Sequence, residues 1–246
     1  MPYRRLPTTD KARLRAIDSA VNMAMKKAEN KLAFSKHSLD ELNRINSTFQ
    51  NSLKQYKLDI KIQSDKNIEY KAALEKARMY VLHFIQVLFM AVERNEIKSE
   101  ALEFYELEEF KGKVPRLNSG QDILEWGNTI IDGEQKRIQN SGSPIYSPSI
   151  ALVKIIVHDF SDAAIFQQNL KRNTARSFEK MQELRKSVNE FISLLWTEIE
   201  ENVVSDSPKQ NRQRAQEYGI VYVFRRKEKK KIKSEGLQTD LLFDFG

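Results

Sequence analysis

Two long stretches without glycine or proline constrain this 246-residue chain more than any other feature. They run from Ser38 to Asn95 and from Ser149 to Val204. Glycine and proline are the residues that most often end helices, so each stretch is predicted to be one continuous helix. The chain holds only eight glycines and six prolines, which favours long helices throughout.

Apolar side chains recur at alternating intervals of three and four residues along both stretches. The first seam is Leu39, Leu42, Asn46, Phe49, Leu53, Tyr56, Ile60, Gln63, Asn67, Tyr70, Leu74, Ala77, Val81, Phe84, Leu88 and Ala91. The second is Val153, Ile156, Phe160, Ala163, Gln167, Leu170, Thr174, Ser177, Met181, Leu184, Val188, Phe191 and Leu195. This repeat is typical of helices that wrap around a partner.

One connection joins the two helices, so we predict that they pack in opposite directions. If their ends align, Leu39 lies near Ser205, and Asn95 lies near Ser149. The polar seam residues Gln63 and Asn67 then fall beside Thr174 and Ser177. Polar layers of this kind commonly specify register at some cost in stability.

Shorter elements complete the predicted fold. Thr8, Thr9 and Asp10 form an N-cap cluster for a first helix, Ser119 and Asp122 resemble a capping box, and Ser207 precedes a proline that suits a helix start. The β-branched and aromatic run Ile220–Phe224 is typical of a strand, and the N-terminal residues are the nearest partner for it. The predicted helices are 9–34, 38–95, 120–140, 149–204 and 208–218, with strands 2–6 and 220–225.

The predicted fold class is therefore all-α: an elongated antiparallel helical bundle or coiled coil, built on two helices of about 55 residues, with a small terminal β-ribbon. We expect residues 1–225 to form a single domain. We expect residues 226–246 to form a basic, mostly disordered tail.

Three segments resemble an uncharacterised family of all-helical bacterial proteins. They are PYRRLPTTDKARLRA near the N-terminus, GSPIYSPSIALVK at the start of the fourth helix, and EYGIVYVFRRKE near the C-terminus. The resemblance spans most of the chain. It implies an all-helical fold and attaches no activity to it.

Motifs that would indicate catalysis are missing from the sequence. There is no cysteine, no glycine-rich phosphate loop, and no glutamate three residues before any of the three histidines. His83 and His158, with Asp159 and Asp162 nearby in sequence, are either a metal site or packed histidines on the helix surface, and we prefer the second interpretation. We therefore predict no catalytic residue, no cofactor and no metal, and we expect Trp126 and Trp196 to belong to the core.

The basic residues are concentrated near the C-terminus. Arg225–Lys233 carries +6 of the net charge of +7, so the rest of the chain is nearly neutral. A solvated charged run, a nucleic-acid contact and an anionic membrane contact are three interpretations of this segment. The candidate nucleic-acid contacts are Arg225, Arg226, Lys227, Lys229, Lys230, Lys231 and Lys233.

Two further segments have alternative interpretations. Gln238, Leu241 and Phe243 resemble the anchors of the short Gln-x-x-Leu-x-Phe peptides with which bacterial replication and repair proteins bind the sliding clamp; the alternative is a tail that folds back or stays mobile. Glu96–Phe110 carries a charge of −5 and is either a solvated surface or a docking patch for a basic partner.

The sequence thus predicts a non-enzymatic helical interaction or scaffold protein that binds an unknown protein partner. One alternative is a nucleic-acid-associated accessory protein that uses the basic tail, with a sliding clamp as a further partner. A second alternative is an unrecognised enzyme. Lack of cysteine, of a secretory signal and of a membrane span leads us to expect a cytoplasmic location. The oligomeric state stays open.

Overall fold

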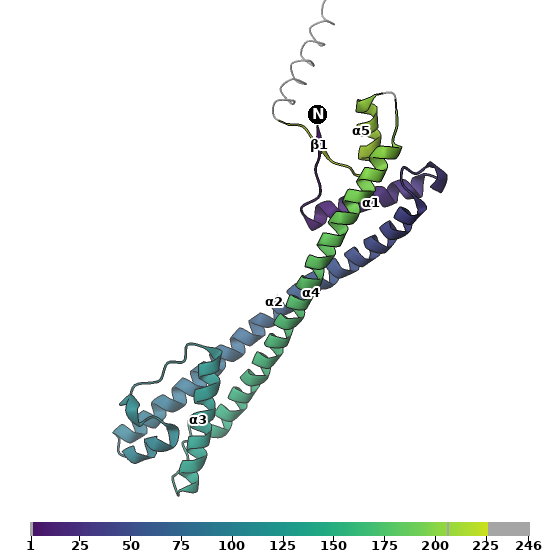
Figure 1. Cartoon of the computed structure of the whole chain (residues 1–246). Coiled ribbons are helices and arrows are strands. Elements are labelled where there is room, and N and C mark those ends of the chain that lie inside the picture. The colour runs from purple at the N-terminus through teal and green to yellow at the C-terminus, as the bar shows by residue number, and fades with distance from the viewer. Residues whose placement is uncertain (1, 206, 226–246) are drawn as a thin grey trace, which may run out of the picture. The chain divides into compact units, whose positions relative to one another are not determined.

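The computed structural model describes residues 2–205 and 207–225 of the chain (Figure 1). The described residues form two compact units. Unit 1 comprises residues 2–56, 177–205 and 207–225, and unit 2 comprises Lys57–Arg176. Each unit has its own hydrophobic core, and a single domain over residues 1–225 stays a prediction.

The two long helices are α2 (Lys36–Glu93) and α4 (Ile150–Asn202), and both are continuous as predicted. In unit 1 the first part of α2 packs on the last part of α4, with Leu42 and Phe49 in the same core as Val188 and Leu195. In unit 2 the last part of α2 packs on the first part of α4, with Phe84 and Leu88 in the same core as Val153 and Ile156. The antiparallel pairing and the all-α fold class are therefore confirmed.

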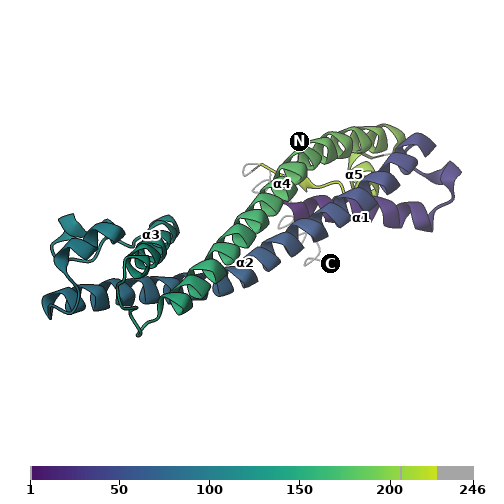
Figure 2. The same cartoon turned by 90° about the horizontal axis from the view of Figure 1, so that it is seen from below.

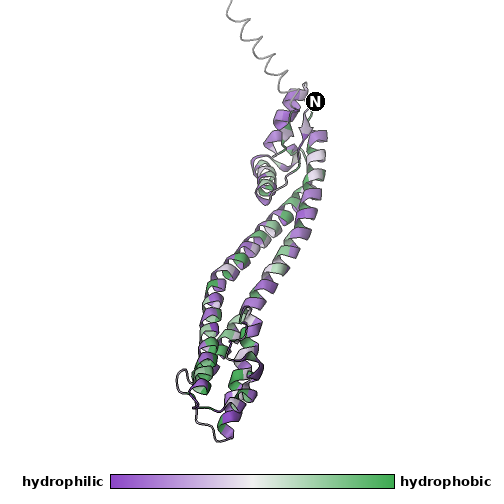
Figure 3. Ribbon diagram, turned by 90° about the vertical axis from the view of Figure 1, so that its left-hand side faces the viewer, coloured by the Kyte–Doolittle hydropathy of each residue, from purple (hydrophilic) through white to green (hydrophobic). Residues whose placement is uncertain are grey.

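The predicted seams are the packed sides of these helices. Every seam residue is buried or half-buried except Ile60, which is exposed. Figure 3 shows hydrophilic and hydrophobic residues alternating along both helices, as in amphipathic helices that bury one side.

The register differs from the prediction. The Ser38 hydroxyl donates to Glu198 over 2.5 Å in unit 1, and the Gln167 side-chain amide donates to Asn67 over 3.2 Å in unit 2. The partner of Asn67 is thus ten residues before the expected Ser177. In unit 2 the start of α4 lies beside Tyr80 and His83 of α2, which border the same small hollow as Leu152. Ile85, Leu88 and Phe89 share their core with Tyr105 and Leu107 of the connection as well as with α4.

Unit 1 adds α1 (Asp10–Lys26) and α5 (Pro208–Glu217) to the helix pair, with the short 3-10 helix η1 (Glu29–Lys31). Figure 2 shows α1 beside α2 and α4. The first helix was expected to continue to residue 34, but it ends at Lys26. Tyr218 explains this, because its hydroxyl accepts from the backbone N–H of Ala33 and from the Lys27 ammonium, and its ring meets Phe34 edge-on. For Lys27 and Ala33 both to reach the Tyr218 hydroxyl, the chain must leave the helix between them.

The terminal ribbon is present and antiparallel, as predicted, and is shorter than expected. Strand β1 (Tyr3–Arg4) pairs with β2 (Tyr222–Val223), so that Tyr3 faces Val223 and Arg4 faces Tyr222. The N–H of Arg5 donates to the carbonyl of Val221 over 2.8 Å and extends the ladder by one residue. The pairing joins the two ends of the described chain.

Unit 2 adds α3 (Gly120–Gln139) to the helix pair, together with the 3-10 helices η2 (Ser99–Tyr105) and η3 (Glu108–Phe110). The predicted capping box is present: Ser119 accepts from the N–H of Asp122, and Asp122 accepts from the N–H of Ser119. Ile123 and Ile130 of α3 lie fully buried against α2 and α4. The third helix therefore covers the pair here as α1 does in unit 1.

Candidate functional site

The sequence-predicted site residues lie almost entirely outside the described residues. Arg225 is described and exposed. The rest of the basic run, Arg226, Lys227, Lys229, Lys230, Lys231 and Lys233, and the motif residues Gln238, Leu241 and Phe243 lie outside. The structure therefore brings none of these residues to a site.

The acidic segment and the histidines are described. Glu96 pairs with Arg94 over 2.8 Å, and Glu100, Glu103, Glu106, Glu108 and Glu109 are exposed on or beside η2 and η3. His158 lies 3.4 Å from Asp162 on the surface of α4, and His83 borders a small hollow with Leu152. Within residues 2–205 and 207–225, no group of three or more candidate ligands could hold a metal ion.

No helix in the described part of the chain is long and apolar enough to cross a membrane.

Unit 2 contains a buried polar cluster that sequence reasoning missed. Glu134 of α3 is 0% exposed and Arg137, one turn later, is 5% exposed. Their side chains form two hydrogen bonds of 2.9 Å each. The Tyr105 hydroxyl donates to Glu134 and accepts from Arg137, and burial, with the hydrogen bond to Glu134 second, raises the pKa of Tyr105.

Backbone groups complete this cluster. Glu134 accepts from the N–H of Ile145 over 2.9 Å, and Arg137 donates to the carbonyl of Ser143 over 2.7 Å. The cluster thus joins α3 to η2 and to the loop that leads into α4. Its strong donors and acceptors face one another, so it holds the fold and leaves no charged group for a ligand.

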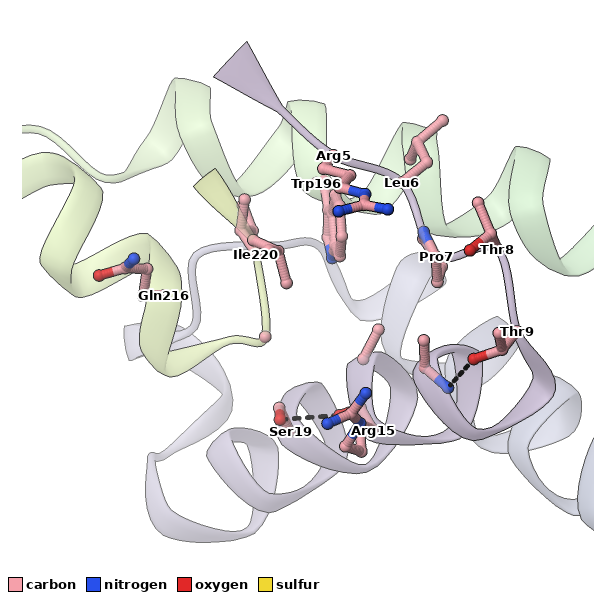
Figure 4. A pocket seen from close by; sticks show the side chains of 14 residues that line it. Arg5, Leu6, Pro7, Thr8, Thr9, Arg15, Ser19, Trp196, Gln216 and Ile220 are labelled. Atoms are coloured by element: carbon pink, nitrogen blue, oxygen red, sulfur yellow. Dashed lines mark hydrogen bonds between the residues drawn. The ribbon is translucent and has the colours of Figure 1, made fainter. Parts of the chain in front are cut away.

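Unit 1 contains a pocket of about 530 Å³, which we name the ribbon pocket. It is bordered by the segment Arg5–Thr9, by the first turns of α1, by Trp196 of α4, and by the segment that follows α5 (Figure 4). Its volume falls within the range of small-ligand and side-chain sites. The sequence prediction of paired chain ends implied that these segments meet, and the pocket lies where they do.

The ribbon is held on α4 by one carboxylate. Glu200 accepts from the Tyr222 hydroxyl over 2.6 Å and from the Arg4 guanidinium over 3.3 Å. Successive side chains of an extended chain point to opposite sides. Because Arg4 turns toward Glu200, Arg5 turns the other way and borders the ribbon pocket.

Gly219 shapes one side of the pocket. Its φ of +93° lies in the left-handed region that favours glycine, and it follows the end of α5, which the sequence predicted at residue 218. A Cβ at this position would lie 2.9 Å from the Cβ of Ser19 and 3.0 Å from the carbonyl oxygen of Ala16. Glycine therefore lets the chain pass directly against α1.

Three hydrogen-bond donors border the ribbon pocket without a partner among the described residues. The guanidinium groups of Arg5 and Arg15 have neither an ion pair nor a side-chain hydrogen bond there. The Trp196 side chain is 1% exposed, and no described residue accepts from its indole N–H. In Figure 4 the indole nitrogen points into the opening above α1. The indole nitrogen is not one of the fully buried side-chain atoms that lack a partner, so its N–H is accessible from the pocket.

Among the described residues, no carboxylate borders the ribbon pocket. Three carboxylate residues adjoin lining residues in the sequence, namely Asp10, Asp18 and Glu217. Asp10 is held by Arg185 over 2.7 Å and by Arg13 over 2.9 Å. The Arg185 hydrogen bond, followed by the charges of Arg185 and Arg13, lowers the pKa of Asp10 despite its partial burial. The pocket therefore presents positive charge and hydrogen-bond donors.

Comparisons with known proteins found no match to a family model, to a curated protein or to a solved structure. The resemblance to an all-helical bacterial family therefore stays a prediction.

Proposed function

We propose that the protein is a non-enzymatic helical interaction protein, a scaffold or adaptor, that captures a partner protein at the ribbon pocket. The observation that carries this proposal is a set of three donors, on Arg5, Arg15 and Trp196, that have no partner in the part of the chain that the structure describes, around a pocket that no described carboxylate borders. A cytoplasmic location belongs to the same proposal, since a chain without cysteine suits a reducing compartment.

The chemistry of the donors supports binding rather than catalysis. Arginine stays protonated at any physiological pH and tryptophan N–H is only a donor, so neither exchanges a proton with a substrate. The two hydroxyl groups nearest the arginines serve the fold: Thr9 accepts from the N–H of Ala12, and Ser19 donates to the carbonyl of Arg15. The pocket can hold a ligand in place and offers no evident group to transform it.

The rim of the pocket suits a protein partner. Leu6 and Val221 are 40% and 49% exposed. The Val221 carbonyl accepts the ribbon's last hydrogen bond, from the N–H of Arg5, and Leu6 follows Arg5. Interfaces commonly combine a few polar anchors with surrounding apolar contact area. A partner side chain in the pocket would bring its neighbours onto this apolar rim.

The alternative is a nucleic-acid-associated accessory protein. Arg4, Arg5 and Arg225 lie on or directly beside the ribbon, and the basic run continues from Arg225. Arginine binds phosphate as readily as carboxylate. Binding of DNA and RNA to the full chain at low and moderate salt tests this alternative, with the seven basic residues of 225–233 replaced by glutamine as the comparison. Binding that depends on these residues supports it.

An unbiased peptide selection tests the proposed function. A displayed library of random ten-residue peptides is selected on the full chain, on an Arg5→Glu/Arg15→Glu variant, and on Arg172→Glu as a matched control. Arg172 is exposed on α4 in unit 2. We expect peptides that are enriched by the chain and the control and are not enriched by the double variant. Enrichment that is equal on all three proteins contradicts the proposal.

A further inference from the structure

We infer that the ribbon pocket recognises the carboxylate of an aspartate or glutamate within an extended, apolar segment of the partner. This inference rests on the proposed function and names the chemistry of its ligand. It is built on the charge of the pocket, on the Trp196 N–H, and on the exposure of the rim.

The charge of the pocket selects an anion. Arg5 and Arg15 supply two positive charges at the border, where no described carboxylate lies, and Asp10 beside it in sequence is bonded to Arg185 and Arg13. Thr8, Thr9 and Ala12, at the start of the 17-residue helix α1, also border the pocket. The positive end of a helix dipole favours negative charge there.

The Trp196 N–H offers a donor inside the pocket. It has no acceptor among the described residues and is accessible from the pocket, so a ligand oxygen that accepts from it gains a hydrogen bond. A carboxylate has two oxygens and about four acceptor sites, enough to accept from the indole N–H and from a guanidinium together. A neutral amide has a single acceptor oxygen and gains no charge interaction with Arg5 and Arg15.

The exposure of the aromatic ring argues for a peptide rather than a nucleic acid. Single-stranded nucleic acids bind by stacking bases on exposed aromatic faces. Among the described residues, Trp196 is the only aromatic residue at the pocket border, and 1% of it is exposed, so its faces are covered by protein. A two-stranded ribbon instead leaves backbone groups at its edges, which an extended peptide can bond. Leu6 and Val221 give apolar contact beside them.

Direct titration of a defined probe tests the inference. The probe is a fluorescein-labelled peptide LDLFDL, with LNLFNL as its uncharged counterpart, and fluorescence anisotropy of the full chain with each is measured at low salt. We expect LDLFDL to bind about tenfold or more tightly than LNLFNL, because hydrogen bonds to a charged group are the stronger ones. We expect Arg5→Gln/Arg15→Gln to weaken the binding of LDLFDL by the same factor.

Two variants complete the design. Trp196→Phe keeps the apolar ring and removes the N–H, and we expect it to weaken LDLFDL by a factor of about two to ten. Arg172→Gln removes an exposed arginine from unit 2, and we expect it to change nothing. Circular dichroism spectra identical to those of the parent chain show that each variant is folded.

The outcomes separate the inference from the proposed function. Equal affinity for LDLFDL and LNLFNL, or LDLFDL binding that survives Arg5→Gln/Arg15→Gln, overturns the inference. Peptides selected from the random library that depend on Arg5 and Arg15 but contain no acidic residue also overturn it, while the proposed function stands. A library that yields no peptide dependent on these arginines overturns both.

Discussion

Units 1 and 2 share a plan and differ in what they do with their polar side chains. In each unit a shorter helix, α1 or α3, covers part of the α2–α4 pair. Unit 2 closes around Glu134 and Arg137, whose charged groups bond to each other and to the backbone. Unit 1 leaves the donors of Arg5, Arg15 and Trp196 without partners in the part of the chain that the structure describes. Unit 2 also has a buried side-chain atom without a partner among the described residues, Gln167 Oε1. The comparison therefore teaches that burial alone does not indicate function, and that donors without partners are informative where several of them border one pocket, as in unit 1.

The largest expected effect is on the buried cluster of unit 2. Glu134→Ala leaves the Arg137 charge without its carboxylate and leaves the N–H of Ile145 without an acceptor. Breaking a buried ion pair by removing one partner typically costs about 3–5 kcal/mol. Urea unfolding followed by circular dichroism measures the loss. Replacing both residues, as Glu134→Leu/Arg137→Met, should cost less than the single change; a larger cost would show that the pair is not what holds α3.

The next effect concerns the close approach of α3 to η2. A Cβ at Gly133 would lie 2.5 Å from the carbonyl oxygen of Phe104 and 2.6 Å from a Tyr105 ring carbon. Gly133→Ala should therefore destabilise unit 2 by about 1–3 kcal/mol, as overpacking does. Gly112→Ala is the matched control, because nothing lies within 4 Å of its added Cβ and only its φ of +80° opposes alanine. A smaller loss at Gly133 than at Gly112, measured by thermal unfolding, would contradict the packing argument.

A smaller effect is expected at the half-buried carboxylate of unit 1. Arg185 and Arg13 lower the pKa of Asp10, so its charged form stabilises the fold at pH values above the ordinary carboxyl pKa, near 4. This stabilisation is lost as the pH falls through the lowered pKa of the folded state. Asp10→Asn should be less stable than the parent chain by about 1 kcal/mol at pH 7, and the difference should shrink below pH 4.

Urea unfolding at pH 7, 4 and 2.5 measures this difference. The exposed pair of Arg94 and Glu96 in unit 2 gives the control, since Glu96→Gln should change stability little at any pH. A stability difference for Asp10→Asn that stays constant down to pH 2.5 would show that the Asp10 charge is not responsible.

The smallest effect on stability is expected at the ribbon pocket. Arg5→Gln/Arg15→Gln removes two exposed charges that have no described partner, so the free energy of unfolding should change by less than about 0.5 kcal/mol per site. Binding of the LDLFDL peptide should nevertheless fall. A destabilisation comparable to that of Glu134→Ala would mean that these arginines hold the fold, and the contrast between the units would disappear.

Local signals in the sequence predicted much of the fold. The seams of α2 and α4, the caps at Ser119 and Ser207, and the helix stop at Gly219 follow from residues close in sequence, so they could be anticipated. The register could not, because Ile85 and Leu88 share their core with Tyr105 and Leu107 of the connection as well as with α4, which the periodicity of the two helices does not indicate. The end of α1 depends on Tyr218, nearly two hundred residues away.

The polar sites were harder to anticipate. Glu134 and Arg137 are three residues apart in sequence and look like an ordinary surface pair until Tyr105 covers them. Residues 2–6 are predicted to pair with 220–225. Because side chains alternate along a strand, this pairing could have predicted that Arg4 and Arg5 point to opposite sides. The orientation of the Trp196 N–H had no signal in the sequence, since a core tryptophan was expected and its ring is indeed buried.

The most direct test uses the two tryptophans of the chain, one in each unit: Trp196 in unit 1 and Trp126 in unit 2. Two-dimensional ¹H–¹⁵N NMR resolves their indole N–H groups, and the Trp196→Phe variant assigns them. On addition of the LDLFDL peptide, we predict a downfield shift of the Trp196 signal, as the N–H gains an acceptor, with the Trp126 signal unchanged. An unshifted Trp196 signal at peptide concentrations that saturate binding, or equal shifts of both signals, would contradict the account.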